Sequence, residues 1–245
     1  MSNQRLIDRQ SSLIEYLLDP RAFGAGVIPG PVPPELAGLD PNGLKINGLF
    51  SLGKRKEKIA ATIPRTWAEL GGKPQYDFFS FASSFRQIDP TRLSNAAQFV
   101  RYLEQVWDRV PAEPPWLPDI ARYELATVRA LDGANKTDAT VPAEIPRPAV
   151  RRRRGVELLV CDYDLRSLVD TSVDAAAPSH RTTRLAVVAT DGGRDLHAFE
   201  LALEPYDLLR RLDAWRAVEG IADPAGDFAA MADALAKRGL LELAE

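Results

Sequence analysis

The hydrophobic pattern of the chain changes at a proline-rich stretch in its middle, and this change constrains the fold more than any other feature. Residues 132–148 include Pro142, Pro146 and Pro148 but show little hydrophobic periodicity, which is typical of an extended linker. Apolar residues recur at helical spacing before the stretch, whereas short alternating runs come after it. A chain of 245 residues can form two compact domains. We therefore expect a domain of residues 1–132, a linker of residues 133–150 and a second domain of residues 151–245.

The first domain is predicted to be all α-helical. Apolar stripes and helix-start signals place helices at 2–19, 41–62, from Pro64 onwards, from Pro74 to Phe85, 94–106 and 118–131. A break in the helix at 41–62, near Gly48 or Gly53, stays open. Gly71 and Gly72 are expected to end the helix that starts at Pro64, and the glycines and prolines of 20–34 predict a loop. Four aromatic side chains are assigned mainly to the core: Trp67, Phe78, Phe79 and Phe85.

The second domain is predicted to contain a small antiparallel sheet and two helices. The sequence places strands at 156–160, 185–189 and 196–201, with a hairpin turn at 191–194 between the last two. Helices are expected at 205–215 and 227–237, with Gly239 as a C-cap. Strands followed by helices indicate an α+β fold. The overall prediction is an all-α domain followed by a small winged-helix-like α+β domain.

Few residues are candidates for chemistry. The sequence contains two histidines, His180 and His197, and one cysteine, Cys161, without the spacing of a metal site. We expect His197 at an exposed strand position, Cys161 in the core, and the acidic pair Asp162 and Asp164 at a solvated strand end. The prediction is that this chain has no catalytic residues and carries no cofactor.

The charge pattern gives two basic runs, at 54–58 and 151–154. The first is expected to form a solvated helix face, and the second either solvates the surface or docks on an acidic partner. A net charge of −3 argues against a dedicated nucleic-acid binder. The lone cysteine, the absence of a signal-peptide core at the start and the absence of a bilayer-spanning apolar run predict a cytoplasmic protein without a membrane partner.

Four stretches of the first half resemble one known family. They are 64–71 (PRTWAELG), 78–85, 99–103 (FVRYL) and 116–124 (WLPDIARYE). They resemble the HvfC/BufC family, which has been described both as a DNA-binding domain and as the partner of multinuclear non-heme iron oxidases. The most specific match is the segment LPDIARYE at 117–124, which is similar to the family's proline-bounded helix start. The order of elements agrees over about residues 1–132, and the early tyrosine-asparagine signature is poorly matched at 44–49.

The resemblance implies an adaptor. In such a pair the oxidase carries the iron, and the adaptor captures the leader of a ribosomally made precursor peptide. The second domain is similar in layout to the peptide-recognition (RRE-like) domains of these partners, which implies strand addition beside the last helix. On that basis the expected peptide-binding residues are Leu196, His197, Phe199, Leu201, Phe228, Met231, Leu235 and Arg238.

Two other functions stay open. A small strand-and-helix domain with basic flanks could be a winged-helix transcription regulator, in which residues 151–154 follow a phosphate backbone. A stand-alone enzyme is the third reading, and the sparse set of catalytic residue types makes it the weakest.

Overall fold

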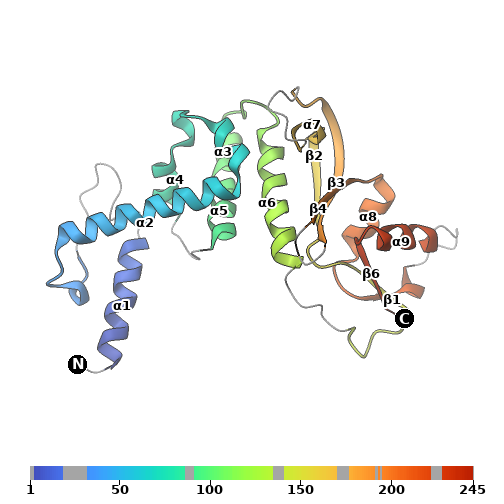
Figure 1. The fold of residues 1–245 in the computed structure, drawn as a ribbon, viewed down its shortest axis with the longest axis horizontal. Helices are drawn as coiled ribbons and strands as arrows, with labels where there is room; N and C mark the ends of the chain where they lie inside the picture. Colours follow the sequence, from blue (N-terminus) through green and yellow to red (C-terminus); the bar gives the residue numbers. More distant parts are fainter. Residues whose placement is uncertain are drawn as a thin grey trace. The chain divides into compact units, whose positions relative to one another are not determined.

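The computed structural model of the protein describes residues 3–18, 32–85, 91–134, 141–169, 177–190, 193, 195–221 and 228–244. The chain divides into two compact units, Met1–Leu117 and Pro118–Glu245 (Figure 1). The first unit contains helices, and the second combines helices with two small antiparallel sheets, so the fold is mixed α+β with a large helical share.

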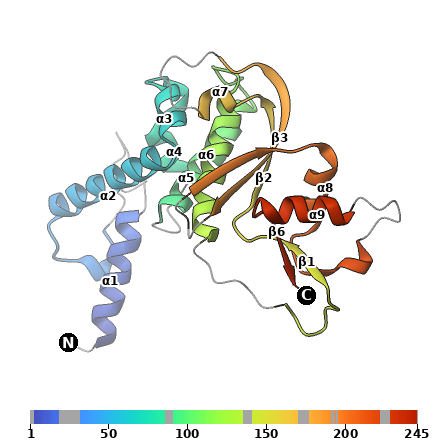
Figure 2. The same ribbon diagram turned by 45° about the vertical axis from the view of Figure 1, so that its right-hand side comes forward.

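The first unit is helical throughout its described residues. Its elements are α1 (Asn3–Leu18), η2 (Pro34–Leu36), α2 (Pro41–Thr62), α3 (Pro64–Leu70), η3 (Pro74–Tyr76), α4 (Phe78–Ser84) and α5 (Arg92–Trp107). The long helix α2 packs against α5 (Figure 2). The side chains of Ile59, Phe81 and Phe99 are fully buried. The helices predicted at 2–19, 41–62 and 94–106 are confirmed.

Side-chain caps decide where two of these helices begin. Asp40 accepts hydrogen bonds from the backbone N–H groups of Asn42 and Gly43, at 3.1 and 3.0 Å, and Pro41 stands at the first position of α2. Asp77 likewise accepts from Phe79 and Ser80. The sequence placed the start of this helix at the proline of η3, but the Asp77 cap starts α4 after η3 has ended.

The second unit has two three-stranded sheets. Its elements are α6 (Leu117–Ala134, of which Leu117 closes the first unit), β1 (Ala149–Arg152), β2 (Glu157–Tyr163), α7 (Arg166–Val169), β3 (His180–Thr190), β4 (Asp195–Glu200), α8 (Leu203–Arg211), β5 (Arg216–Ala217), η4 (Val218–Gly220), α9 (Phe228–Lys237) and β6 (Leu241–Ala244). The larger sheet has the antiparallel order β2-β3-β4, which confirms the three predicted strands. The smaller sheet, β5-β1-β6, was not predicted.

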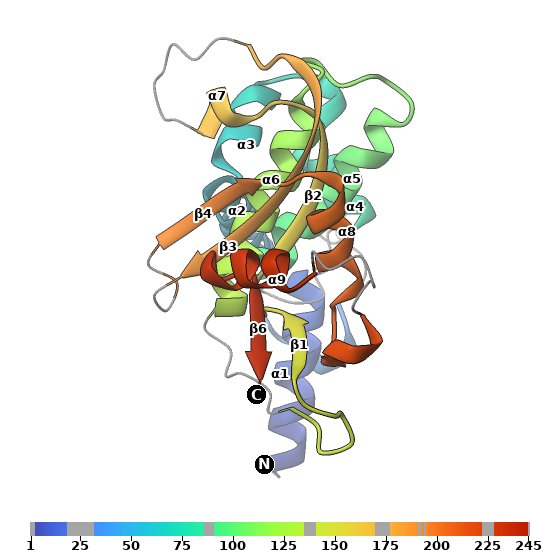
Figure 3. The ribbon, with the colours of Figure 1, turned by 90° about the vertical axis from the view of Figure 1, so that its right-hand side faces the viewer.

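The larger sheet is covered on both faces. Helices α8 and α9 lie on one face and α6 on the other (Figure 3). Ala186 and Val188 of β3 point into a core formed with α8 and α9, while the alternate residues Val187 and Ala189 pack against α6. Near the end of α6 a Cβ added to Gly133 would lie 2.4 Å from the Cα of Gly155. This contact shows how closely the helix approaches the chain that leads into β2.

Helix α6 therefore packs within the second unit. The sequence assigned it to the first domain and placed the boundary at residue 132, because its apolar stripe resembles those of the preceding helices. The structure divides the chain after Leu117, one helix earlier. Of the predicted linker at 133–150, Gly133 is helical and β1 begins at Ala149.

Some sequence-based predictions fall outside the described residues. These are most of the loop at 20–34, the linker residues 135–140, three residues of the hairpin turn at 191–194, and the predicted helix start at Asp227. Gly71 and Gly239 do stand at the predicted helix ends, with φ angles of 57° and 69°.

Candidate functional site

Strand β4 forms one edge of the larger sheet. Among the described residues it pairs with β3 alone. The Leu201 N–H donates to the Arg184 carbonyl at 2.8 Å, and hydrogen-bonded pairs alternate along an antiparallel ladder. His197 lies opposite Val188, and Phe199 lies opposite Ala186. Counting back from Leu201 in steps of two, the backbone N–H and C=O groups of Phe199 and His197 therefore bond to β3.

It follows from this alternation that Leu196, Ala198 and Glu200 direct their N–H and C=O groups away from β3. The side chains of all three are exposed. An edge of this kind can add a further strand, since its backbone groups have partners on one side only.

The structure separates the eight predicted peptide-binding residues into three groups. Leu201 and Leu235 are buried in the core, so an incoming peptide cannot reach them. Phe199, Phe228 and Met231 are half-buried and pack against that core. The side chains of Leu196, His197 and Arg238 are exposed, which confirms the expected strand position of His197.

The half-buried Phe199 contacts two of the exposed residues, His197 and Arg238. The Arg238 guanidinium, at the end of α9, lies 6.0 Å from the Phe199 ring centroid, near the limit of a cation–π contact. The His197 ring stacks on the Phe199 ring, which lies on the same face of β4, with the two centroids 6.0 Å apart. Strand β4 and helix α9 are thereby joined by one aromatic contact at the surface.

At the opposite edge of the sheet, formed by β2, a buried carboxylate accepts hydrogen bonds from two backbone N–H groups. Asp119, in the first turn of α6, accepts from the N–H groups of Asp162 and Tyr163 at 2.7 and 3.0 Å, where β2 is irregular. Burial raises the pKa of Asp119, against the two hydrogen bonds that lower it. Burial, and then the Asp119 charge, also raises the pKa of Cys161 to about 12, so this thiol is a buried hydrophobe as predicted.

A network of ion pairs connects the end of β4 with β3, α7 and the residues between β2 and α7. Arg181 donates to Glu200 at 2.6 and 2.9 Å and to Asp164 at 2.9 Å, and Arg166 also pairs with Asp164. Hydrogen bonds from Arg166, and then from Arg181, lower the pKa of Asp164. The sequence pattern predicted a solvated strand end at Asp164 and did not indicate these two arginines, which come from α7 and β3.

Both basic runs contain an arginine that is buried. Arg55 is 2% exposed; its guanidinium donates to Asn95, Gln98 and the Phe85 carbonyl and lies 4.4 Å from the Phe81 ring centroid. Burial lowers its pKa to about 10. The prediction of a wholly solvated helix face at 54–58 is therefore wrong at this position.

In the second run, Arg151 is 4% exposed and pairs with Glu242 of β6 across the smaller sheet, with Nε 2.6 Å from Oε2. It also lies 4.6 Å from the Trp215 ring centroid. Arg151 is thus part of the interior, which removes it from the docking surface considered for 151–154. Arg151 is buried because it belongs to the strand β1, which was not predicted because a run of arginines is not typical of a strand.

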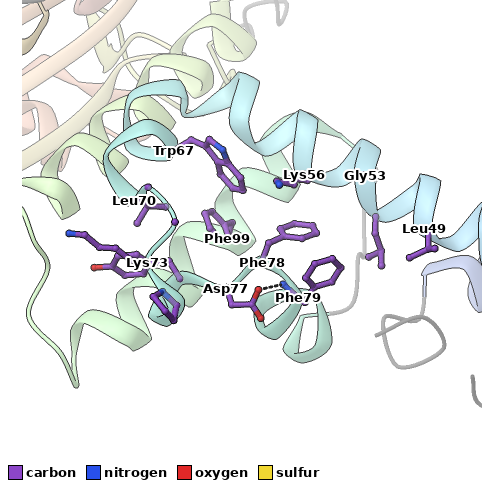
Figure 4. A pocket seen from close by; sticks show the side chains of 15 residues that line it. Leu49, Gly53, Lys56, Trp67, Leu70, Lys73, Asp77, Phe78, Phe79 and Phe99 are labelled. Atoms are coloured by element: carbon purple, nitrogen blue, oxygen red, sulfur yellow. Dashed lines mark hydrogen bonds between the residues drawn. The ribbon is translucent and has the colours of Figure 1, made fainter. Parts of the chain in front are cut away.

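The first unit contains a hollow lined by aromatic side chains, with a volume of about 340 Å³ (Figure 4). Trp67, Phe78 and Phe79 contribute from α3 and α4, and Phe99 contributes from α5. Phe79 is 44% exposed, so its assignment to the core is wrong, whereas Phe81 and Phe99 are fully buried.

Neither a protein-family model nor a curated protein matches this sequence. In the described part of the chain, no group of three or more histidine, cysteine or acidic side chains is arranged to hold a metal ion. No helix in that part combines the length and the apolar character needed to cross a membrane.

Proposed function

We propose that this chain is a non-catalytic adaptor that binds the leader of a ribosomally made precursor peptide and presents it to a multinuclear non-heme iron oxidase. The observation that supports the proposal is the open edge of β4, with three residues whose backbone groups point outward. An extended peptide beside β4 would gain backbone hydrogen bonds, and its alternate side chains would be read by the neighbouring residues.

The proposed surface is smaller than the one expected from the sequence. We keep Leu196, His197, Phe199 and Arg238 as its centre, because they lie at the strand edge and at the end of α9. Half-buried Phe228 and Met231 are placed at its border. The core residues Leu201 and Leu235 act only by holding α9 against the sheet.

As part of this proposal, the second unit is a winged-helix-like peptide-recognition domain of the RRE-like kind. The three-stranded sheet β2-β3-β4 with α8 and α9 on one face supports it, since such a layout places a free strand edge next to a helix. The iron would belong to the oxidase, and both proteins would act in the cytoplasm.

The DNA-binding alternative has weaker support. It relied on residues 151–154 to follow a phosphate backbone, and the charge of Arg151 is already paired with Glu242. Phosphate contacts require basic side chains that are free to displace counterions.

Reconstitution tests the proposal. The chain is expressed with each short peptide and each multinuclear iron oxidase that the neighbouring genes encode, and the mass of the peptide is measured with each component left out in turn. The expected result is a mass change only when all three are present. Modification of the precursor by this chain and precursor alone, or by the oxidase at an equal rate without this chain, would contradict the adaptor role.

A further inference from the structure

An apolar stripe of α2 faces solvent. Ile46, Leu49, Phe50 and Gly53 stand at positions i, i+3, i+4 and i+7, so they lie on one side of the helix. Phe50 is 68% exposed, and Ile46 and Leu49 are also exposed. Large apolar side chains that cluster on a surface mark sites of interaction.

The stripe is bordered by two hollows that form one groove. The first hollow is the aromatic one lined by Trp67, Phe78 and Phe79. The second, of about 420 Å³, is lined by the stripe together with Lys54 and Glu57. Figure 4 shows Leu49 and Gly53 of α2 at the rim of the first hollow. The same two residues also line the second hollow, so we treat the two as one groove along α2.

Gly53 keeps the middle of the groove open. A Cβ added there would meet no atom within 4 Å, so the glycine is not required by packing inside the unit. Its missing side chain allows another backbone to approach α2 closely, as small residues do at helix–helix contacts.

The charge along the groove favours an acidic occupant. Asp77 is engaged with the N-terminus of α4, and Glu57 pairs with Lys54 at 3.0 Å. The ammonium group of Lys56 lies 5.9 Å from the Trp67 ring centroid, and among the described residues it has no carboxylate partner. A negative charge on the occupant would pair with Lys56 at the rim of the first hollow.

We propose that this groove is the docking site for an acidic amphipathic helix of a partner protein, which places two apolar side chains about one turn apart in the two hollows and a carboxylate near Lys56. A helix fits because the groove follows α2 and offers ridges at i, i+3 and i+4 rather than a strand edge. The inference stands on the groove alone, and the oxidase of the proposed function is one protein that could supply such a helix.

The test uses two fluorescein-labelled designed helical peptides of about 18 residues with the same leucine and phenylalanine face. One carries glutamate at its polar positions and the other carries lysine. Fluorescence anisotropy with the full chain should show binding of the acidic peptide and at least about tenfold weaker binding of the basic one. Neither oxidase nor leader peptide is present, so failure here leaves the proposed function untouched.

Two variants locate the binding. G53L fills the groove and should weaken binding of the acidic peptide by about tenfold or more, and K56E should do the same by reversing the rim charge. R101E, which makes the same change of charge on exposed α5 outside the groove, should bind as the wild type does. G53L should also melt no lower than the wild type, since leucine is the better helix former.

Several results would overturn the inference. They are no binding of the acidic peptide, equal binding of the basic peptide, or an equal loss of binding in R101E. A concentration-dependent dimer in sedimentation that G53L abolishes would assign the groove to a second copy of this chain instead. Saturation by naphthaleneacetate without peptide binding would assign it to a small aromatic acid.

Discussion

At the scale of single residues, the buried Arg55 joins three helical segments of the first unit. Its guanidinium donates to Asn95 and Gln98 of α5 and to the carbonyl of Phe85, next to α4. Replacing it by alanine leaves the acceptors of Asn95 and Phe85 without their donor in a buried region. We expect Arg55→Ala to lower the free energy of unfolding by about 3 kcal/mol in urea denaturation.

The neighbouring Lys54 provides the matched control, because it belongs to the same basic run but is exposed. Lys54→Ala should change the free energy of unfolding by less than about 0.5 kcal/mol. Equal effects of the two substitutions would show that Arg55 does not hold the segments together.

The contribution of Asp164 to the stability of the fold should depend on pH. The pKa of Asp164 is lowered by its arginine partners, so its contribution to stability is present above the carboxyl's unfolded pKa of about 3.9 and is lost as pH falls towards the folded value. Asp164→Asn should therefore lower the urea midpoint at pH 7, and the difference from the wild type should shrink below about pH 4. Asp195→Asn, at the other end of β4, is the control and should change the urea midpoint little at either pH. If the midpoint of Asp164→Asn differed from that of the wild type by the same amount at both pH values, the stabilising ion pairs of Asp164 would be refuted.

At the scale of elements, two helical glycines have opposite surroundings. A Cβ at Gly133 of α6 would collide with the backbone of Gly155, whereas a Cβ at Gly53 of α2 would meet nothing within 4 Å. Gly133→Ala should destabilise the chain by about 1–3 kcal/mol through overpacking, while Gly53→Ala should stabilise it by up to about 1 kcal/mol. Thermal and urea unfolding measure both, and destabilisation of the same size in the two variants would refute the close approach of α6.

Elements with a strong local signal could be predicted from the sequence. The Asp40-Pro41 start and the apolar spacing gave α2 with its observed bounds, and alternation gave β2, β3 and β4. The strands of the smaller sheet could not be predicted, since β1 is rich in arginine and β5 has two residues. Their pairing depends on contacts between residues far apart in the sequence, such as Arg151 with Glu242.

The candidate site was predictable only in part. The strand and the helix were placed correctly, but the sequence could not tell which of their apolar residues face the core. Leu235 and Phe228 have the same helical periodicity, yet Leu235 is buried and Phe228 is half-buried. A proline at Phe199 would break the ladder to β3, because the N–H group of that residue faces β3.

At the scale of the whole molecule, the boundary after Leu117 makes α6 part of the second unit. A fragment of residues 118–245 should unfold cooperatively. A fragment of residues 133–245 lacks Asp119 and exposes Val187 and Ala189, so it should bind a hydrophobic dye and lose the sharp transition. Circular dichroism melting compares the two fragments, and equal cooperativity would instead favour a boundary at residue 132.

Capture of an extended peptide by the open edge of β4 can be tested with one substitution in that strand. Ala198→Pro removes an outward N–H without touching the ladder to β3, and Ala198→Ser keeps that N–H as the matched control. The measurement is the affinity for the fluorescein-labelled leader of the precursor peptide found in the reconstitution experiment, with folding checked by circular dichroism. We expect Ala198→Pro to bind the leader at least about tenfold more weakly than the wild type, and Ala198→Ser to bind it equally well. An unchanged affinity in a folded Ala198→Pro protein would show that the edge of β4 is not the binding site.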